Sequence, residues 1–374
     1  MKTQNTVRAL RDQIKRELPA DTFKPEKWRL IWFLPLVGLV VASWLVLTLV
    51  SPAWYWCLLI ALVIGNTFGS LGFLSHEASH GAMGIQGKWK SFFAGIGFAP
   101  FLLTPGFWHR WHNLAHHGNT NMGDKDPDSF GTLKRYDRNP GQKKLLKLAP
   151  GSGTWYSYLF LFYSFTLHSQ AVLWLQTKHR EEFRGFNRSR AILGMFALLG
   201  FWIALGVVMG PKAASFGIVI PHLIGNAVIQ SYILTNHFLR PQTAINDPVD
   251  NSMSLKSLPL IDRLHFNFSH HVEHHLFPKL PMNKAPRLRQ WFLANVPERY
   301  VYPTHSTALK YLYKTPKVYA DALTLIDVNN PNFTVDLVAL NQQLNPNFKA
   351  PLNTDRKTSH TNSPQNMEEA IPMA

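Results

Sequence analysis

Two long runs without a charged residue lie near the start of the chain. Leu30–Val50 and Trp54–Ser75 contain no Asp, Glu, Lys or Arg, and the short segment Ser51–Ala53 separates them. An α-helix needs roughly 20 mainly apolar residues to cross the hydrocarbon core of a bilayer. The pattern therefore predicts two membrane-spanning helices joined by a tight turn.

Four further uncharged runs follow, and two of them predict a second helical hairpin. Residues 191–211 and 213–236 are separated by Lys212, so we expect four membrane crossings in all. If residues 91–108 or 151–177 also crossed the membrane, the spans on either side of them would no longer have the orientation that the two hairpins require. We expect residues 91–108 to be partly embedded, because two prolines break the run. Residues 151–177 carry tyrosines, a histidine and a glutamine, which suits a helix lying in the membrane interface.

The basic residues predict the orientation of these helices. Eight Lys and Arg precede the first span and residues 178–190 are also basic, so we place both segments in the cytoplasm. A soluble helical protein is disfavoured because its buried helices are usually shorter and interrupted by charge. The predicted fold class is an all-α, multi-pass integral membrane protein. It has four transmembrane helices in two hairpins, interfacial helices and a cytoplasmic histidine-rich cap.

The same pattern divides the chain into four parts. We expect a basic cytoplasmic N-terminus over residues 1–29, a membrane domain over 30–300, a cytoplasmic extension over 301–350 and a disordered tail over 351–374. The tail is rich in Asn, Thr, Ser and Pro and has almost no large apolar residues to bury on folding.

Composition narrows the function classes. The 38 Lys and Arg against 22 Asp and Glu give a net charge of +16, which would suit a nucleic-acid-binding protein. Charged residues make up only 16% of the chain and aromatic residues reach 13%, so membrane orientation explains the charge better, and we expect no nucleic-acid partner. A single cysteine, Cys57, excludes a disulfide framework and a cysteine-ligated metal cluster, whereas the chain has 17 histidines.

Several histidines fall into clusters with helical spacing. His76 and His80 are four residues apart, as are His112 and His116, so each pair shares one face of a helix. With the predicted topology, these two clusters, a third over residues 270–275 and the single His237 all lie on the cytoplasmic face of the membrane. The nine candidate metal ligands are His76, His80, His112, His116, His117, His237, His271, His274 and His275. One ion takes about four to six ligands, so nine nitrogen donors suit two neighbouring ions.

The histidine pattern has other possible interpretations. A lone pair four residues apart is often surface chemistry, but three clusters on one membrane face favour a metal site. Zinc is less suitable, since structural zinc sites commonly use cysteine and catalytic ones combine histidine with a carboxylate. The donor set favours a redox-active pair such as di-iron, activating O₂ beside a membrane-embedded substrate. We expect no ligand role for His168, His179, His222, His305 and His360. Three more histidines are left ambiguous at this point: His109, His265 and His270.

In order and spacing, the three clusters resemble the histidine boxes of the membrane fatty acid desaturase family. The family patterns HxxxH, HxxHH or HxxxHH, and HxxHH correspond to residues 76–80, 112–117 and 271–275. The flanking sequences HNLAHHGNTN, followed by KDPD, and HHVEHHLFPKLP also resemble the family. The resemblance covers about residues 30–300.

The resemblance implies a non-haem di-iron centre held by the eight box histidines, with O₂ as co-substrate for removing two hydrogens from an acyl chain. Family members have a further histidine at the cytoplasmic end of the fourth span, and His237 matches it as a ninth ligand. Some members hold a metal-bound water with an asparagine one turn earlier. This chain has Ile233 there, so that role is not transferred. Four carboxylates near the boxes are expected either to orient imidazole N–H groups or to lie exposed: Glu77, Asp126, Asp128 and Glu273.

The resemblance also implies partners. The family takes two electrons per turnover, and this chain has neither a His-Pro-Gly-Gly segment nor a cysteine cluster. We therefore expect a separate electron donor of ferredoxin or cytochrome b5 type. Both carriers are typically acidic, which gives the basic charge a use in docking and in holding anionic membrane lipids. The implied substrate is an acyl lipid or an acyl thioester, and the end of a hydrophobic tunnel is expected to decide the product.

Two alternatives stay open. Another enzyme on the same scaffold would be a hydroxylase, a carotenoid ketolase or hydroxylase, or an alkene-forming fatty acid decarboxylase, because a small shift in substrate pose redirects the same oxidant. A membrane metal transporter or metal-binding protein without catalysis would place ionisable residues inside its spans. The predicted spans contain no Asp, Glu, Lys or Arg, which disfavours the transporter.

Overall fold

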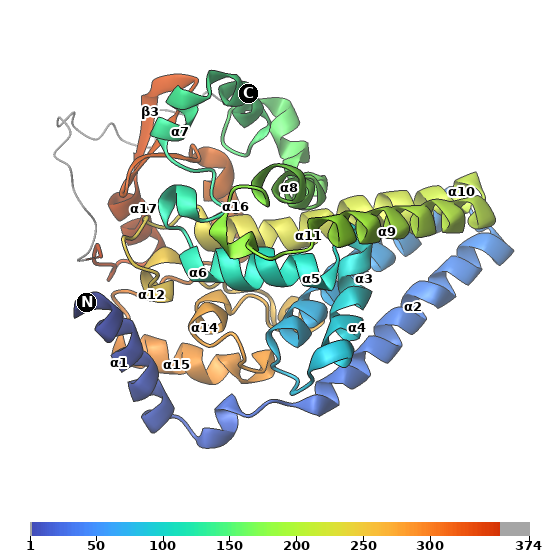
Figure 1. The fold of residues 1–374 in the computed structure, drawn as a ribbon, viewed down its shortest axis with the longest axis horizontal. Coiled ribbons are helices and arrows are strands. Elements are labelled where there is room, and N and C mark those ends of the chain that lie inside the picture. The colour runs from blue at the N-terminus through green and yellow to red at the C-terminus, as the bar shows by residue number, and fades with distance from the viewer. Residues whose placement is uncertain (1, 352–374) are drawn as a thin grey trace.

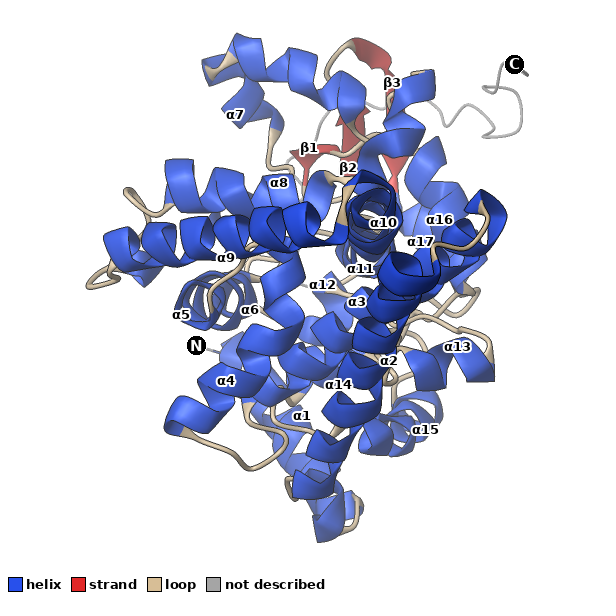
Figure 2. Cartoon of the chain, turned by 90° about the vertical axis from the view of Figure 1, so that its right-hand side faces the viewer, coloured by secondary structure: helices blue, strands red, loops and turns tan. Residues whose placement is uncertain are grey.

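The computed structural model describes residues 2–351, so the tail predicted over 351–374 lies, apart from Pro351, outside the described residues. Most of the described chain is helical (Figures 1 and 2). Four helical stretches are long and apolar enough to cross a membrane, as the sequence predicts: Lys27–Val50, Trp54–His80, Arg188–Met209 and Pro211–His237.

Each predicted pair of spans is joined by a short connection and extends to the same end of the molecule (Figure 1). The elements of the first pair are η2 (Lys27–Trp32), α2 (Phe33–Leu45), η3 (Val46–Val50) and α3 (Trp54–His80). Those of the second pair are α9 (Arg188–Met209), α10 (Pro211–Ala214), η11 (Ser215–Val219) and α11 (Ile220–His237).

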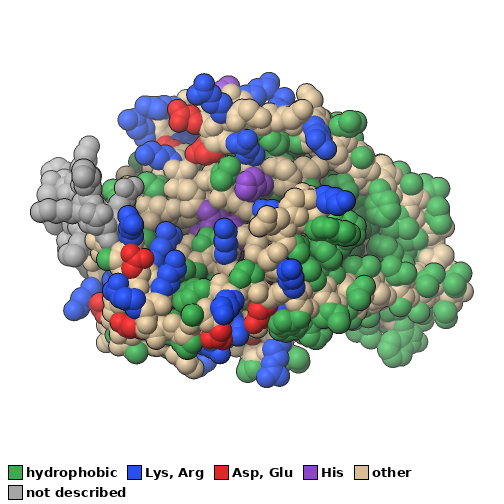
Figure 3. Space-filling model, turned by 60° about the horizontal axis from the view of Figure 1, so that its bottom comes forward, with side chains coloured by type: hydrophobic (Ala, Val, Ile, Leu, Met, Phe, Trp, Pro, Cys, Tyr) green, Lys and Arg blue, Asp and Glu red, His purple; other side chains and the backbone are tan. Residues whose placement is uncertain are grey.

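The outer surfaces of these helices are apolar. Leu34, Leu49, Val207 and Val208 are between 72% and 79% exposed, which would be costly in water over so large a patch. Figure 3 shows hydrophobic side chains covering this end of the molecule, whereas most Lys, Arg, Asp and Glu gather over the rest of the face in view. The distribution fits a multi-pass membrane protein with one end in lipid.

Glycines allow α3 and α11 to pack closely. A Cβ atom at Gly65 would lie 2.5 Å from Cβ of Ile224, and one at Gly69 would lie 2.6 Å from Cγ1 of Val228. Small residues at such positions let two membrane helices approach without a side chain between them. Because His80 and His237 end these two helices, this packing brings the first histidine cluster and His237 to one level.

Residues 87–119 form a bent helical pair. The stretches Gly87–Phe101 and Pro105–Asn119 meet at 95°, consistent with the break predicted at the prolines. The elements of this pair are α4 (Gly87–Phe98), η4 (Ala99–Phe101), α5 (Pro105–Trp108), η5 (His109–His116) and α6 (His117–Asn119).

The stretch expected to lie in the interface is helical but broken into three pieces, which are η8 (Trp155–Phe162), α8 (Ser164–Ala171) and η9 (Val172–Gln176). The chain around these helices contributes shorter elements. They are η6 (Gly123–Lys125), α7 (Leu133–Arg138), η7 (Pro140–Leu148) and η10 (Glu181–Phe183).

Most of the remaining helices lie towards the end of the molecule away from the apolar surface (Figure 1). From the N-terminus come α1 (Lys2–Glu17) and η1 (Ala20–Phe23). After the last span come α12 (Pro248–Asn251), α13 (Pro259–Leu264), α14 (His271–Leu276), η12 (Met282–Lys284), α15 (Ala285–Asn295) and α16 (His305–Lys314). The third histidine cluster lies on α14.

The chain after α16 contains a small sheet that the all-α expectation did not include. Strands β1 (Val318–Asp321), β2 (Thr324–Asp327) and β3 (Asn330–Asp336) are antiparallel and lie in sequence order. Helix α17 (Leu337–Leu344) follows, and the Asp336 side chain accepts hydrogen bonds from its first backbone N–H groups. Apolar side chains of the sheet and of α17 pack in the main hydrophobic core.

Candidate metal centre

The nine predicted histidines come together from four parts of the chain. His76 and His80 lie on the last turns of α3, and His237 is the last residue of α11. The second box spans η5 and the start of α6, and the third box lies on α14. Eight of the nine side chains are buried and His117 is half-buried.

Their ring nitrogens form two neighbouring groups. Five of them, from His76, His80, His112, His117 and His274, lie within 4.8 Å of one another, and the same holds for three from His116, His237 and His275. His271 adjoins the smaller group, because its Nε2 lies 2.7 Å from Nε2 of His237. We call these the five-histidine group and the His237 group, the latter including His271.

The spacing within the groups fits metal ligation. The Nε2 atoms of His76 and His112 are 2.9 Å apart, and His117 Nε2 lies 3.2 Å from both His112 Nε2 and His274 Nε2. Two imidazole nitrogens bound at about 2.1 Å to one ion at a right angle would be about 3 Å apart. Nε2 of His80 and of His275 are buried and, among residues 2–351, have no hydrogen-bond partner. These nitrogens are free to bind a metal.

The histidines on α14 are held in the neutral form that binds metals. Burial, together with the neighbouring imidazoles, places the pKa values of His271, His274 and His275 well below the usual histidine value. Neutral imidazole keeps a lone pair for a cation, whereas imidazolium does not.

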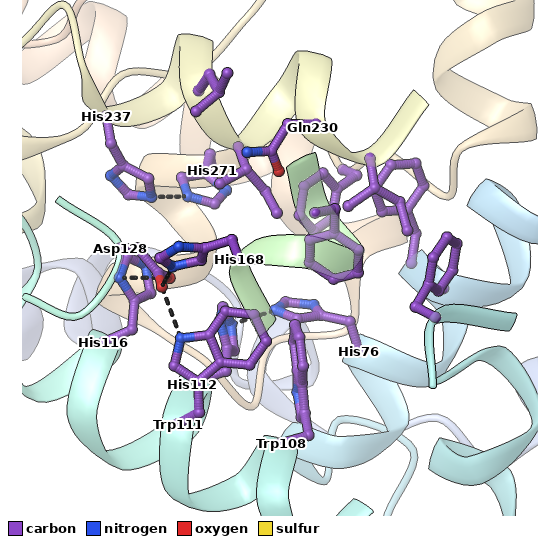
Figure 4. Close-up of a pocket in the computed structure, with 18 of the residues that line it drawn as sticks. His76, Trp108, Trp111, His112, His116, Asp128, His168, Gln230, His237 and His271 are labelled. Carbon is purple, nitrogen blue, oxygen red and sulfur yellow. Dashed lines mark hydrogen bonds and ion pairs between the residues drawn. The ribbon is translucent and has the colours of Figure 1, made fainter. Parts of the chain in front are cut away.

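Two of the four candidate carboxylates contact a box histidine. Asp126 Oδ1 accepts a hydrogen bond from His116 Nδ1 at 2.9 Å, and Asp128 Oδ2 lies 3.3 Å from the same nitrogen. This contact directs Nε2 of His116 towards His237 and His275, the other two histidines within 4.8 Å. Asp128 also accepts hydrogen bonds from Trp111 Nε1 at 2.7 Å and His168 Nε2 at 3.0 Å (Figure 4).

The other two candidate carboxylates are buried but contact none of the nine histidines. Glu77 forms two hydrogen bonds with Arg29, at 2.7 and 2.6 Å, which connect the first span to α3. Glu273 accepts hydrogen bonds from Tyr300, Ser254 and His270. Glu77 and Glu273 therefore neither lie exposed nor orient a box histidine by direct contact.

The three ambiguous histidines lie outside both groups. His109 is exposed. Both ring nitrogens of His265 contact other side chains, Nδ1 the hydroxyl of Tyr232 at 2.9 Å and Nε2 the amide oxygen of Asn66 at 3.0 Å. His270 Nδ1 contacts Glu273.

Among the five histidines expected to have no ligand role, His168 is in contact with the site. It lies beside the cavity and bonds Asp128, and nothing in its sequence neighbourhood indicated this. His179 is exposed, whereas His360 lies outside the described residues. The remaining two bond backbone carbonyls, His222 that of Ile218 and His305 that of Ser231.

A cavity of about 110 Å³ adjoins both histidine groups. Its walls are mainly aromatic and aliphatic, including Phe73, Phe101 and Phe165, and one side carries His76, His112, His116, His237 and His271 (Figure 4). The wall also contains Gln230, whose Oε1 is buried without a hydrogen-bond partner within the described chain. Sequence reasoning missed Gln230, although it precedes His237 by seven residues and so lies on the same helix face.

The sequence model of the fatty acid desaturase family matches residues 52–307. The chain belongs to the fatty acid desaturase family. Fatty acid desaturases are oxidoreductases, and this desaturase is an enzyme of that class acting in lipid metabolism. The family match includes all three histidine clusters, His237 and the cavity walls, but ends before the C-terminal sheet.

Several curated desaturases are similar to this one. It is 23% identical over 313 residues to an sn-1 acyl-lipid omega-3 desaturase (ferredoxin) of Synechocystis sp., an alignment covering 78% of this chain and 82% of that protein. It is 26% identical over 282 residues to an acyl-lipid (7-3)-desaturase of Rebecca salina, covering 66% of this chain and 60% of the relative. A Delta(6)-fatty-acid desaturase of Caenorhabditis elegans is 23% identical, with 60% of this chain and 56% of the relative covered.

Proposed function

We propose that this desaturase introduces a carbon–carbon double bond into an acyl chain, using O₂ and two iron ions held by the nine histidines. The observation that carries the proposal is the pair of buried nitrogen-rich groups beside one apolar cavity. In balanced form, a –CH₂–CH₂– unit, O₂, two electrons and two protons give a –CH=CH– unit and two water molecules. When bound, the iron pair supplies the oxidising chemistry on O₂ that breaks unactivated C–H bonds.

The protein residues position the substrate and keep water out. The aromatic cavity wall favours a methylene chain over water and holds it next to His76, His112 and His271. The ring of Trp108 stacks on that of His112 with the centroids 4.3 Å apart, which restricts the imidazole to one orientation. Asp126 and Asp128 do the same for His116 through its Nδ1 atom.

We further propose that the spans form two transmembrane hairpins, with the N-terminus and the histidine boxes in the cytoplasm. Helices α3 and α11 both end at a predicted ligand, so their C-terminal ends lie on the same side. The eight basic residues before the first span support a cytoplasmic position for that side. The domain boundaries near residues 30, 300 and 350 remain proposals drawn from the sequence.

The names of the relatives support a membrane lipid as the substrate and a separate electron donor. The Synechocystis and Rebecca proteins are named acyl-lipid desaturases, and the first name specifies ferredoxin. We therefore propose an acyl-lipid substrate ahead of an acyl thioester, and a ferredoxin-type donor ahead of cytochrome b5. The net charge of +16 suits an acidic carrier.

Lipid profiling tests the proposal directly. Expression of the full chain in a host with a suitable electron donor is expected to add a double bond to one class of its acyl chains, and the purified protein is expected to contain about two iron ions per chain. The location of the new double bond is read by mass spectrometry of derivatised fatty acids. A hydroxylated, ketolated or chain-shortened product would instead support one of the other activities on this scaffold.

A change of Gln230 to leucine tests the role of the cavity wall. An unpartnered buried amide costs about 1–3 kcal/mol, so we expect Gln230→Leu to raise the melting temperature in detergent. We expect the desaturation rate to fall about tenfold with unchanged iron content. Gln230 lines the substrate cavity, and leucine cannot form the hydrogen bond that we expect the amide to form when the cavity is occupied.

Gln170→Leu is the matched control for this change. Gln170 also has a buried Oε1 without a hydrogen-bond partner in the described part of the chain, but it does not line the cavity. It is expected to raise the melting temperature and leave the rate unchanged. Equal rates for wild type and Gln230→Leu would show that the amide has no part in turnover.

A further inference from the structure

The helix that carries His237 ends inside the protein, and the backbone directly after it is buried as well. A buried carbonyl outside a helix or a sheet ladder needs a hydrogen-bond donor, whereas at a surface water would serve it. Here His237 is 3% exposed, and Leu239 and Arg240 are fully buried. Donors must therefore come from other side chains, and their positions fix the backbone that follows His237.

Two residues of the C-terminal extension supply donors to this backbone. The Tyr319 hydroxyl on β1 donates to the carbonyl oxygen of Arg240 at 2.8 Å. The Asn341 amide on α17 donates to the carbonyl oxygen of Leu239 at 2.9 Å and accepts a hydrogen bond from the Arg240 side chain. Both residues are fully buried and lie beyond residue 307, where the family match ends.

Asn121 connects the backbone that follows His237 to His116, a second member of the His237 group. Its side-chain amide donates to the carbonyl oxygens of Arg240 and Pro241 and to the Tyr319 hydroxyl, each at 3.1 Å. Its backbone N–H donates to Asp126 at 2.7 Å, and Asp126 holds Nδ1 of His116. The segments that carry His116 and His237 are thus joined where Tyr319 meets them.

The position of Tyr319 is itself set from both sides of β1. Its backbone N–H donates to the carbonyl oxygen of Gly131 at 3.1 Å, and its ladder partner on β2 is Leu325. On the far side of Arg240, the guanidinium lies over the ring of Phe348 at 5.0 Å. The contacts join a strand, a helix and the following loop of the extension to one five-residue segment, 237–241.

We propose that Tyr319 and Asn341 are positioning residues of the metal centre, acting through the backbone of residues 237–241 on His237. We call these two residues the C-terminal brace. The inference rests on the proposed metal-binding function and assigns part of it to a segment outside the matched family region. Removing Asn341 takes away the side-chain donor to the buried Leu239 carbonyl, and removing the Tyr319 hydroxyl takes away one of the two side-chain donors to the Arg240 carbonyl and an acceptor of the Asn121 amide. The backbone then shifts, and His237 moves relative to His116, His271 and His275. The five-histidine group has no such contact with the extension among the described residues.

Metal titration of the full-length protein in detergent tests the brace. The metal-free protein is titrated anaerobically with Co²⁺, whose absorption spectrum reports ligation, and the two binding steps are fitted separately. We expect wild type to bind two ions, and Tyr319→Phe to bind the first ion as before and the second about tenfold more weakly. Asn341→Leu is expected to act in the same direction.

Tyr311→Phe is the matched control. Tyr311 lies on α16, before the sheet, and its hydroxyl bonds Gln343 at the surface rather than residues 237–241. It is expected to bind both ions as wild type does. Thermal unfolding of the metal-free proteins shows that each variant is folded.

The outcomes separate this inference from the proposed function. Unchanged affinity for both ions in Tyr319→Phe and in Asn341→Leu overturns the brace alone. Equal weakening of both ions also overturns it, because that would reflect a general loss of structure. A wild-type protein that binds no metal ion overturns the proposed function and the brace with it.

Discussion

Desaturation is expected to fall below detection in His274→Ala, with loss of one of the two bound metal ions. Nε2 of His274 lies 3.2 Å from Nε2 of His117, and its ring lies 4.4 Å from that of His76 and 4.7 Å from that of His80. It is the member of the five-histidine group that α14 contributes. Its removal takes away the nitrogen donor that α14 contributes and leaves three neighbouring imidazoles without their common partner.

The measurement combines iron content per chain with the fatty acid profile of the expressing host. His179→Ala is the control, because His179 is exposed and belongs to neither histidine group. It is expected to leave both readouts unchanged. Full activity in His274→Ala would remove His274 from the ligand set and with it the grouping of five.

The second large effect is expected at Arg29. Replacing it with methionine leaves Glu77 as a buried carboxylate without its cation, since the two side chains are 4% and 2% exposed and 2.6 Å apart. Breaking a buried ion pair in this way costs about 3–5 kcal/mol. Glu77 also accepts a hydrogen bond from the backbone N–H of Met282, so the pair joins the first span, α3 and the segment after the third box.

Denaturant or thermal unfolding in detergent measures this effect. Lys27→Met removes a nearby exposed cation and is expected to change the free energy of unfolding little. The double variant Arg29→Met/Glu77→Met removes both charges and is expected to regain much of the lost stability, because no unpaired charge stays buried. If Arg29→Met alone were as stable as wild type, the pair would not support the packing of the first span.

The spans and the ligand candidates could be predicted from the sequence because both depend on local patterns. Uncharged runs long enough to cross a bilayer predicted all four stretches that the structure shows to be sufficiently apolar. Helical spacing placed His76 beside His80 and His112 beside His116, and the structure brings all nine predicted histidines to one place. Charge and spacing between neighbours in sequence carry this information directly.

The division of the nine histidines into groups was decided by tertiary structure. The boxes themselves did not indicate that His117 joins the first box while His116 joins His237 and His275. These two neighbours in sequence point to different groups because adjacent residues on a helix face different directions. Which group each one enters depends on where α3, α11 and α14 meet.

The supporting contacts were likewise invisible in the sequence. Glu77 and Asp126 both lie near histidine boxes, yet Glu77 pairs with Arg29, 48 residues away, while Asp126 contacts His116. Tyr319 reaches the segment after His237 from 79 residues further along the chain. Such pairs arise only when distant segments pack, and their energies depend on burial that no local pattern encodes. The sequence by itself predicted four apolar spans and a set of histidines suited to metal binding, and only the tertiary structure decided how those histidines are divided, oriented and braced.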